Sequence, residues 1–134
     1  MGKYKVIVTA RSFGKADDQA LRLLEEHGCD VVRLAAGDAA FDEQIKKEIT
    51  AADAVIAGLD AYSRELIDSA ERLKVISRYG VGYDKVDVEA ANRKGILVTI
   101  TPGANGDSVA DLAVTLMLDA ARNVAAMDAA MKAR

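Results

Sequence analysis

The residues best suited to chemistry stand together in one short stretch, Arg78-Tyr79-Gly80-Val81-Gly82-Tyr83-Asp84. It follows the apolar run Val75 to Ser77, which is typical of the end of a buried strand. Glycine lets the backbone approach a bound group closely, so Gly80 and Gly82 can direct amide N–H groups at an anion beside the Arg78 cation. The stretch therefore predicts a site for a small carboxylate or phosphate.

The same residues also suit plainer structural roles. Gly80 and Gly82 are compatible with a simple turn between a strand and a helix, and Arg78 with a solvated or salt-bridged surface cation. The glycines do not make a dinucleotide-binding fingerprint, because Lys85 stands where its third glycine would be. No residue of this stretch needs to be an acid catalyst.

A second segment with phosphate-binding features is Thr9-Ala10-Arg11-Ser12-Phe13-Gly14-Lys15. It superficially resembles a flavodoxin phosphate loop, since hydroxyls, a glycine and a following helix N-terminus can hold phosphate. With no tryptophan and 4% aromatic residues, however, the chain offers little to sandwich a flavin ring. The neighbours His27 and Cys29 flank Gly28 at an expected helix end, and we interpret both as structural.

The composition limits the classes of partner and cofactor. The 134 residues are 51% hydrophobic and 29% charged, which suits one soluble domain. A net charge of -3 argues against nucleic acid or an anionic membrane surface as partner. One cysteine and one histidine exclude an internal disulfide and a Cys/His metal cluster. No signal-peptide core and no run of 18 apolar residues is evident, so we expect a cytoplasmic protein.

Apolar runs of strand length alternate with helical patterns along the chain. This alternation predicts an α/β fold with a parallel sheet that is covered by helices on both faces. We expect a flavodoxin-like, three-layer fold with five strands in the order 2-1-3-4-5. The expected strands are Tyr4–Thr9, Val31–Leu34, Asp53–Gly58, Leu73–Ser77 and Ile96–Ile100, and the expected helices are Lys15–His27, Asp42–Thr50, Ser63–Arg72 and Val86–Lys94.

The carboxyl ends of parallel strands share one edge of the sheet, and ligands of open α/β sheets bind there, near the switch in strand order. The loops expected at this edge are Arg11–Gly14, Ala35–Ala40, Leu59–Tyr62, Arg78–Tyr83 and Thr101–Asn105.

A last helix is expected from about Asp107, after the single proline, Pro102, ends the fifth strand. No proline interrupts the chain beyond that point. The helix is apolar over most of its circumference, which is normal for a helix buried on more than one side. One apolar stripe contains Val109, Leu112, Leu116 and Met117, and a second contains Val114, Leu118 and Ala121.

The glycine stretch resembles the D-2-hydroxyacid dehydrogenase family, particularly its 3-phosphoglycerate dehydrogenases. The likeness runs from about Asp53 to the C-terminus. The resemblance implies that Arg78, Tyr79, Gly80, Val81 and Gly82 face the substrate carboxylate. The family commonly has asparagine where this chain has Ile100. The other residues that carry the resemblance are Asp87, Asn92, Gly95-Ile96 and Thr101-Pro102-Gly103-Ala104-Asn105.

The same resemblance implies that substrate binding and NAD binding belong to different domains of the full-length proteins. Its NAD-binding domain, with the catalytic arginine, acid and histidine, would begin just after Arg134. We therefore expect residues 1-134 to be a single substrate-binding domain with a C-terminal helical segment at 107-134. No catalytic, NAD-binding or metal-binding residue is expected within it, and alone it should not transfer hydride.

The expected ligand is a small 2-hydroxy or 2-oxo acid, bound weakly. In the family the helix at 107-134 packs on the nucleotide domain and at a dimer interface, which implies a homodimer through this segment. The alternative interpretation is a stand-alone or engineered flavodoxin-like scaffold or interaction protein with no retained ligand.

Overall fold

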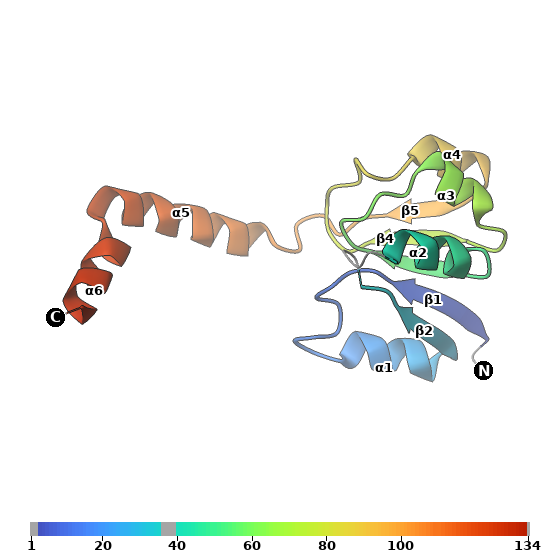
Figure 1. Ribbon diagram of the computed structural model, residues 1–134, viewed down its shortest axis with the longest axis horizontal. Helices are drawn as coiled ribbons and strands as arrows, with labels where there is room; N and C mark the ends of the chain where they lie inside the picture. Colours follow the sequence, from blue (N-terminus) through green and yellow to red (C-terminus); the bar gives the residue numbers. More distant parts are fainter. Residues whose placement is uncertain (1–2, 36–39, 134) are drawn as a thin grey trace. The chain divides into compact units, whose positions relative to one another are not determined.

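The computed structural model describes residues 3–35 and 40–133, and Figure 1 shows its elements in chain order. The chain divides into two compact units, Met1–Pro102 and Gly103–Arg134. The strands of the first unit are β1 (Tyr4–Val8), β2 (Cys29–Arg33), β3 (Ala54–Ala57), β4 (Val75–Arg78) and β5 (Leu97–Thr99). Its helices are α1 (Gln19–Glu26), α2 (Phe41–Ile49), α3 (Arg64–Ser69) and α4 (Val88–Arg93).

The five strands form one sheet in the order β2-β1-β3-β4-β5, and every pair is parallel. This arrangement confirms the predicted flavodoxin-like topology. The strand order reverses between β1 and β3, where Val6 pairs with Ala54. Crossover connections of this kind bring all the strand carboxyl ends to one edge, so the segments after β1, β3 and β4 meet there.

One face of the sheet carries the main core. Ile7, Val55 and Ile76 are completely buried on this face, under three helices that each contribute two buried side chains. Alternation along a strand sends its next residue to the opposite face, which explains why Ile7 and Val8 belong to different clusters. The contributing side chains are Ile45 and Ile49 from α2, Leu66 and Ile67 from α3, and Ala90 and Ala91 from α4.

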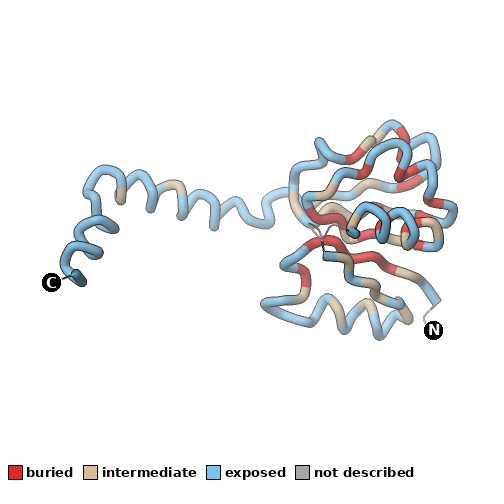
Figure 2. The backbone as a smooth tube through the Cα atoms, in the orientation of Figure 1, coloured by how far each residue is buried: buried red, intermediate tan, exposed pale blue. Residues whose placement is uncertain are grey.

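The opposite face carries a smaller cluster beneath α1. Val8, Ala10 and Phe13 are its buried members, and Leu21 and Leu24 of α1 pack against them. No residue of α1 is itself buried, so this helix covers the face less completely than the three helices opposite (Figure 2). The predicted helices on both faces are confirmed, with unequal coverage.

Most element boundaries differ from the sequence predictions by one or two residues, and three of the differences bear on the argument. Helix α1 begins at Gln19 instead of Lys15, because the Asp17 carboxylate accepts a hydrogen bond from the Gln19 N–H at 2.8 Å and forms a turn before the helix. Helix α3 ends at Ser69 instead of Arg72, since Ala70 is already extended. Strand β4 continues through Arg78, which was expected in the loop. Of the loop expected at Ala35–Ala40, residues 36–39 lie outside the described part.

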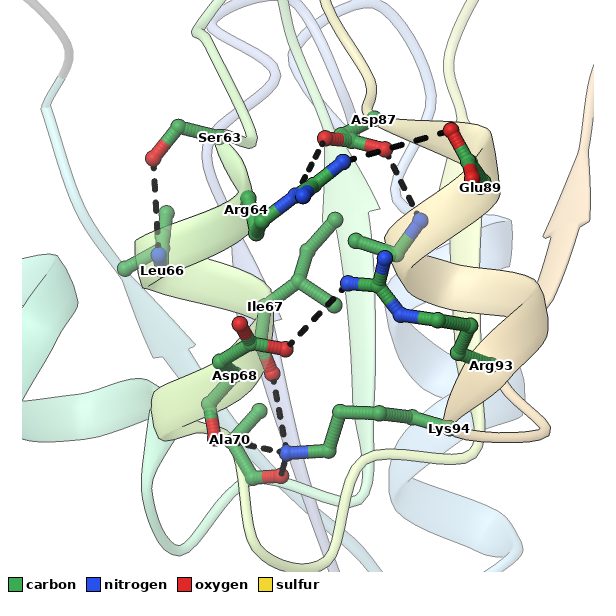
Figure 3. A network of polar contacts seen from close by, with 11 residues as sticks. Ser63, Arg64, Leu66, Ile67, Asp68, Ala70, Asp87, Glu89, Arg93 and Lys94 are labelled. Atoms are coloured by element: carbon green, nitrogen blue, oxygen red, sulfur yellow. Dashed lines mark hydrogen bonds and ion pairs between the residues drawn. The ribbon is translucent and has the colours of Figure 1, made fainter.

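Helices α3 and α4 are tied together by polar contacts (Figure 3). The Asp87 carboxylate accepts from the Ala90 N–H at 2.8 Å and so caps α4, and Arg64 of α3 lies 3.5 Å from the same carboxylate. Lys94, which follows the C-terminal end of α4, caps the C-terminus of α3. Its Nζ donates at 3.1, 2.7 and 2.7 Å to the carbonyl oxygens of Ile67, Asp68 and Ala70.

The second unit consists of α5 (Gly106–Arg122) and α6 (Val124–Lys132). The uninterrupted helix expected from Asp107 is thus divided at Asn123, which has a left-handed φ of 53°. Asparagine tolerates this conformation better than most residues, and the Asp119 carboxylate accepts from the Ala125 N–H at 2.8 Å and caps α6. The break was missed because neither proline nor glycine marks it.

Neither α5 nor α6 contains a buried residue, although both are rich in apolar side chains. Leu118, for example, exposes 62% of its surface. The described residues include no helix whose length and apolarity would allow it to cross a membrane.

Candidate functional site

The segments after β1, β3 and β4 enclose a pocket of about 550 Å³ at the carboxyl edge of the sheet. It lies where the strand order reverses, which is the position expected for a ligand in an open α/β sheet. The pocket has cationic, anionic and hydroxyl side chains in its lining, so it suits a small polar ligand. The lining residues are Thr9, Ala10, Arg11, Ser12, Gly58, Leu59, Asp60, Arg78 and Tyr79.

Arg78 reaches the pocket from the last position of β4. Its Nη1 donates to the carbonyl oxygens of Tyr79, at 2.7 Å, and of Ala57, at 3.3 Å. These two bonds fix the guanidinium over the strand end. The Nε and Nη2 groups have no hydrogen-bond or ion-pair partner in the part of the chain that the structure describes, and together they form the fork that matches a carboxylate.

Gly80 makes room for this arrangement. Its φ is 149°, and a Cβ at this position would stand 3.0 Å from Nη1 of Arg78. A side chain at residue 80 would therefore strain the backbone and displace the cation. The Gly80 N–H donates to the carbonyl oxygen of Arg78 at 2.9 Å, so it is not available to an anion, and the Gly80 carbonyl accepts from Thr101 at 3.0 Å.

Tyr79 lies beside Arg78 and is half exposed. Its ring meets that of Phe13 edge to face, with ring centroids 5.7 Å apart and an interplanar angle of 86°. Phe13 belongs to the segment after β1, so the aromatic pair joins two of the three segments that form the pocket.

Tyr62 connects all three segments and was not singled out from the sequence. Its phenol shares a hydrogen bond of 3.0 Å with the Thr9 hydroxyl, which also accepts from the Gly58 N–H at 2.9 Å. Its backbone pairs with the loop after β4, accepting from Asp87 at 3.0 Å and donating to Lys85 at 2.8 Å. Burial raises the pKa of Tyr62, so the phenol stays protonated and holds the loops in place.

The five predicted binding residues have different positions in the structure. Arg78 and Tyr79 line the pocket, whereas Gly80, Val81 and Gly82 form the turn next to it. The N–H groups of Val81 and Gly82 have no hydrogen-bond partner among the described residues, and both residues are exposed. The glycines also do not form a dinucleotide site, since α4 begins only at Val88 and presents no helix N-terminus to them.

Two further groups of residues line the pocket, although the sequence analysis did not predict them as binding residues. Thr9, Arg11 and Ser12 come from the segment interpreted as a weak phosphate-loop candidate, and they line the Arg78 pocket. Arg11 and Lys15 of the same segment also line a second pocket, which they share with Arg33. Asp60 follows β3 in a loop expected at this edge, but no motif marks it. The predicted strand order already placed these segments side by side. That order was the only feature of the sequence from which these lining residues could have been predicted.

The open parallel sheet places the chain in the doubly wound α/β class, whose ligands bind at the switch point where this polar pocket lies. This chain belongs to the D-isomer specific 2-hydroxyacid dehydrogenase family, because the model of that family's catalytic domain matches residues 6–133. The recognition made from the glycine stretch is thereby confirmed.

Individual relatives agree with this assignment. The D-3-phosphoglycerate dehydrogenase of Methanocaldococcus jannaschii is 43% identical over 116 residues, which are 86% of this chain and 21% of that protein. The crystal structure of TT0316 protein from Thermus thermophilus superposes with a TM-score of 0.83 and 37% identity, over 96% of this chain and 40% of that one. NAD+-bound 3-phosphoglycerate dehydrogenase of Entamoeba histolytica gives a TM-score of 0.73 and 33% identity, over 87% of this chain and 38% of that one. The chain thus spans only a minor part of the length of each relative.

Proposed function

We propose that this chain is the substrate-binding part of an NAD-dependent D-2-hydroxyacid dehydrogenase of the 3-phosphoglycerate dehydrogenase type. Its ligand is a small 2-hydroxy or 2-oxo acid whose carboxylate pairs with Arg78. The observation that carries this proposal is the guanidinium at the pocket, with Nη1 fixed by two carbonyls and its remaining N–H groups unpaired within the described residues. A pre-oriented Arg fork recognises a carboxylate through two parallel hydrogen bonds.

We expect weak binding, because the pocket is open and water competes for its charges. Affinity near millimolar corresponds to a binding free energy of only about 4 kcal/mol. A titration with D-glycerate and 2-oxo acids, followed by amide chemical shifts, tests this. Shifts should concentrate at residues 78–83 and at Thr9 to Ser12.

Two arginine variants locate the site. Arg78→Ala should abolish the shifts without unfolding the protein, whereas Arg22→Ala, which removes an exposed cation paired with Asp18 on α1, should leave them unchanged. Equal affinity in Arg78→Ala and the parent would place the ligand elsewhere.

We further propose that these 134 residues alone do not catalyse hydride transfer. Orientation of a nicotinamide and acid-base catalysis supply much of the rate of such a reaction, and the glycine turn does not fit a dinucleotide. Incubation with NAD and either 3-phosphoglycerate or D-glycerate should give no NADH above the blank. Measurable turnover would disprove the proposal.

The competing proposal is a scaffold or interaction protein without a ligand. It predicts that no hydroxy or oxo acid changes any amide shift at millimolar concentration. The Arg78→Ala comparison separates the two proposals directly, because a scaffold has no binding signal for the variant to lose.

The apolar surface of α5 supports a proposal about assembly. Leu112, Leu116 and Leu118 are all exposed, and burying one such side chain contributes about 1.5 to 3 kcal/mol. We infer a homodimer through residues 107-134, in which two such helices pair about a twofold axis. Sedimentation at micromolar concentration should show a dimer that Leu118→Lys weakens. A monomer unaffected by Leu118→Lys would refute this.

The cytoplasmic localisation expected from the sequence stays a prediction.

A further inference from the structure

Among the described residues that line the pocket, Asp60 is the only one with a carboxylate, and its Oδ2 oxygen is unsatisfied. That oxygen is buried and has no hydrogen-bond partner among the described residues. It lies against the end of β3, where a Cβ added to Gly58 would stand 3.1 Å from it. A buried acceptor that has lost its water contacts costs free energy until a donor reaches it. No described residue donates to either oxygen of the Asp60 carboxylate, and a turn of this side chain toward the pocket would bring the acceptor to a ligand that donates a hydrogen bond.

Arg78, in the same pocket, needs a hydrogen-bond acceptor from the ligand instead of a donor. Its unpaired N–H groups match an anionic, acceptor-only group. Burial is the main cause that raises the pKa of Tyr62, and the Asp60 charge adds to this shift while the Arg78 charge opposes it. Both charges thus act on the Tyr62 phenol, and both residues line the same pocket. A third charged residue, Arg11, also lines the pocket.

We propose that Asp60 is a specificity-determining residue that selects unphosphorylated hydroxy acids. The ligand offers its carboxylate to Arg78 and a hydroxyl to Asp60, as D-glycerate can. A phosphate in place of that hydroxyl has no proton to donate when fully ionised, and its negative charge is repelled by the carboxylate. This inference rests on the proposed function and narrows its ligands to unphosphorylated acids, so it sets this chain apart from the D-3-phosphoglycerate dehydrogenase to which it is similar.

The test compares two ligands that differ only in the phosphate, D-glycerate and 3-phospho-D-glycerate, by amide-shift titration of the 134-residue chain. The parent should bind D-glycerate at least about tenfold more tightly, a difference of about 1.4 kcal/mol. Asp60→Asn keeps the size of the side chain and removes its charge, and should shrink this preference at least about tenfold by strengthening the binding of the phosphorylated acid. Asp60→Ser provides a second neutral variant if Asp60→Asn does not fold.

Asp84→Asn is the matched control. Asp84 is an exposed carboxylate of the loop after β4 that does not line the pocket. Its neutralisation changes the net charge by the same amount and should leave the ratio of the two affinities unchanged. An equal effect of Asp84→Asn and Asp60→Asn would overturn the proposal, because general charge repulsion would then explain the preference.

Failure of this inference can be told apart from failure of the proposed function. If both acids bind through Arg78 and their affinity ratio is the same in the parent and in Asp60→Asn, only the role of Asp60 is overturned. A parent that prefers the phosphorylated acid also overturns it. If neither acid shifts any amide signal in any variant, both the proposed function and this inference are overturned.

Discussion

Ile67 and Ile76 in the first unit are completely shielded from solvent, whereas Leu116 and Leu118 in the second unit expose 59% and 62% of their surfaces. Both units are rich in apolar residues, but only the first has a sheet on which helices can lie. Helix α5 is on average more apolar than the core helix α2, yet none of its residues is buried. An apolar pattern thus predicts a need for burial and does not say which surface supplies it.

The largest expected difference between the units comes from truncating one apolar side chain in each. Ile67→Ala should lower the free energy of unfolding of the first unit by about 2 to 5 kcal/mol, because it leaves a cavity between α3 and the sheet. Leu116→Ala, the matched truncation in α5, should leave that value unchanged within about 0.5 kcal/mol. Urea unfolding followed by circular dichroism measures both. Comparable losses would mean that the two units share one core.

A smaller effect is expected at the contact that holds the pocket together. Tyr62→Phe removes the hydrogen bond with Thr9 and should cost about 0.5 to 1.5 kcal/mol of stability. Because Tyr62 acts by positioning the segments around the pocket, the variant should also weaken D-glycerate binding while Arg78 remains in place. Tyr83→Phe is the control, since Tyr83 is exposed. A stability loss without any change in binding would show that Tyr62 has no positioning role.

The strand order followed from the sequence because apolar runs and helical patterns alternate, and right-handed crossovers leave few arrangements. Arg78 could be proposed as a binding residue in the same way, because a cation beside glycines at a strand end suits an anion, although the same pattern also suits a surface cation. Asp60 and Tyr62 could not be found, because their roles depend on which loops meet in space. The break at Asn123 depends on one left-handed residue and on a carboxylate four residues earlier, a combination that no periodicity reveals.

Acid should affect the first unit through Asp53. Its carboxylate accepts from the Lys5 N–H at 2.8 Å and pairs with Arg72 at 2.9 Å, and these contacts hold the pKa of Asp53 below its ordinary value of 3.8. Because the pKa of Asp53 is lower in the folded state than in the unfolded state, its ionised carboxylate stabilises the folded protein at pH values above the unfolded-state pKa. This stabilisation is lost as the pH falls through the folded-state pKa. Stability of Asp53→Asn should therefore fall less steeply below about pH 4 than that of the parent.

Asp128→Asn in the second unit is the control for this acid effect. Its carboxylate forms an exposed pair with Lys132, which contributes little to stability. Denaturant midpoints of the first unit, measured between neutral pH and the acid limit, should be the same for Asp128→Asn and the parent. An acid slope that Asp53→Asn leaves unaltered would assign the acid sensitivity to other carboxylates.

The effects expected at Asn123 are confined to the second unit, and the order of two variants decides whether α5 and α6 are separate helices. In the left-handed conformation glycine is tolerated freely, so Asn123→Gly should change the helix content of the second unit very little, whereas Asn123→Val should cost about 1 to 2 kcal/mol. In a continuous helix the order reverses, because glycine in a helix interior costs about 1 kcal/mol relative to alanine and valine costs less. Circular dichroism of the isolated segment 103–134 in both variants measures the difference. Greater loss of helix in Asn123→Gly than in Asn123→Val would restore the uninterrupted helix that the sequence predicts.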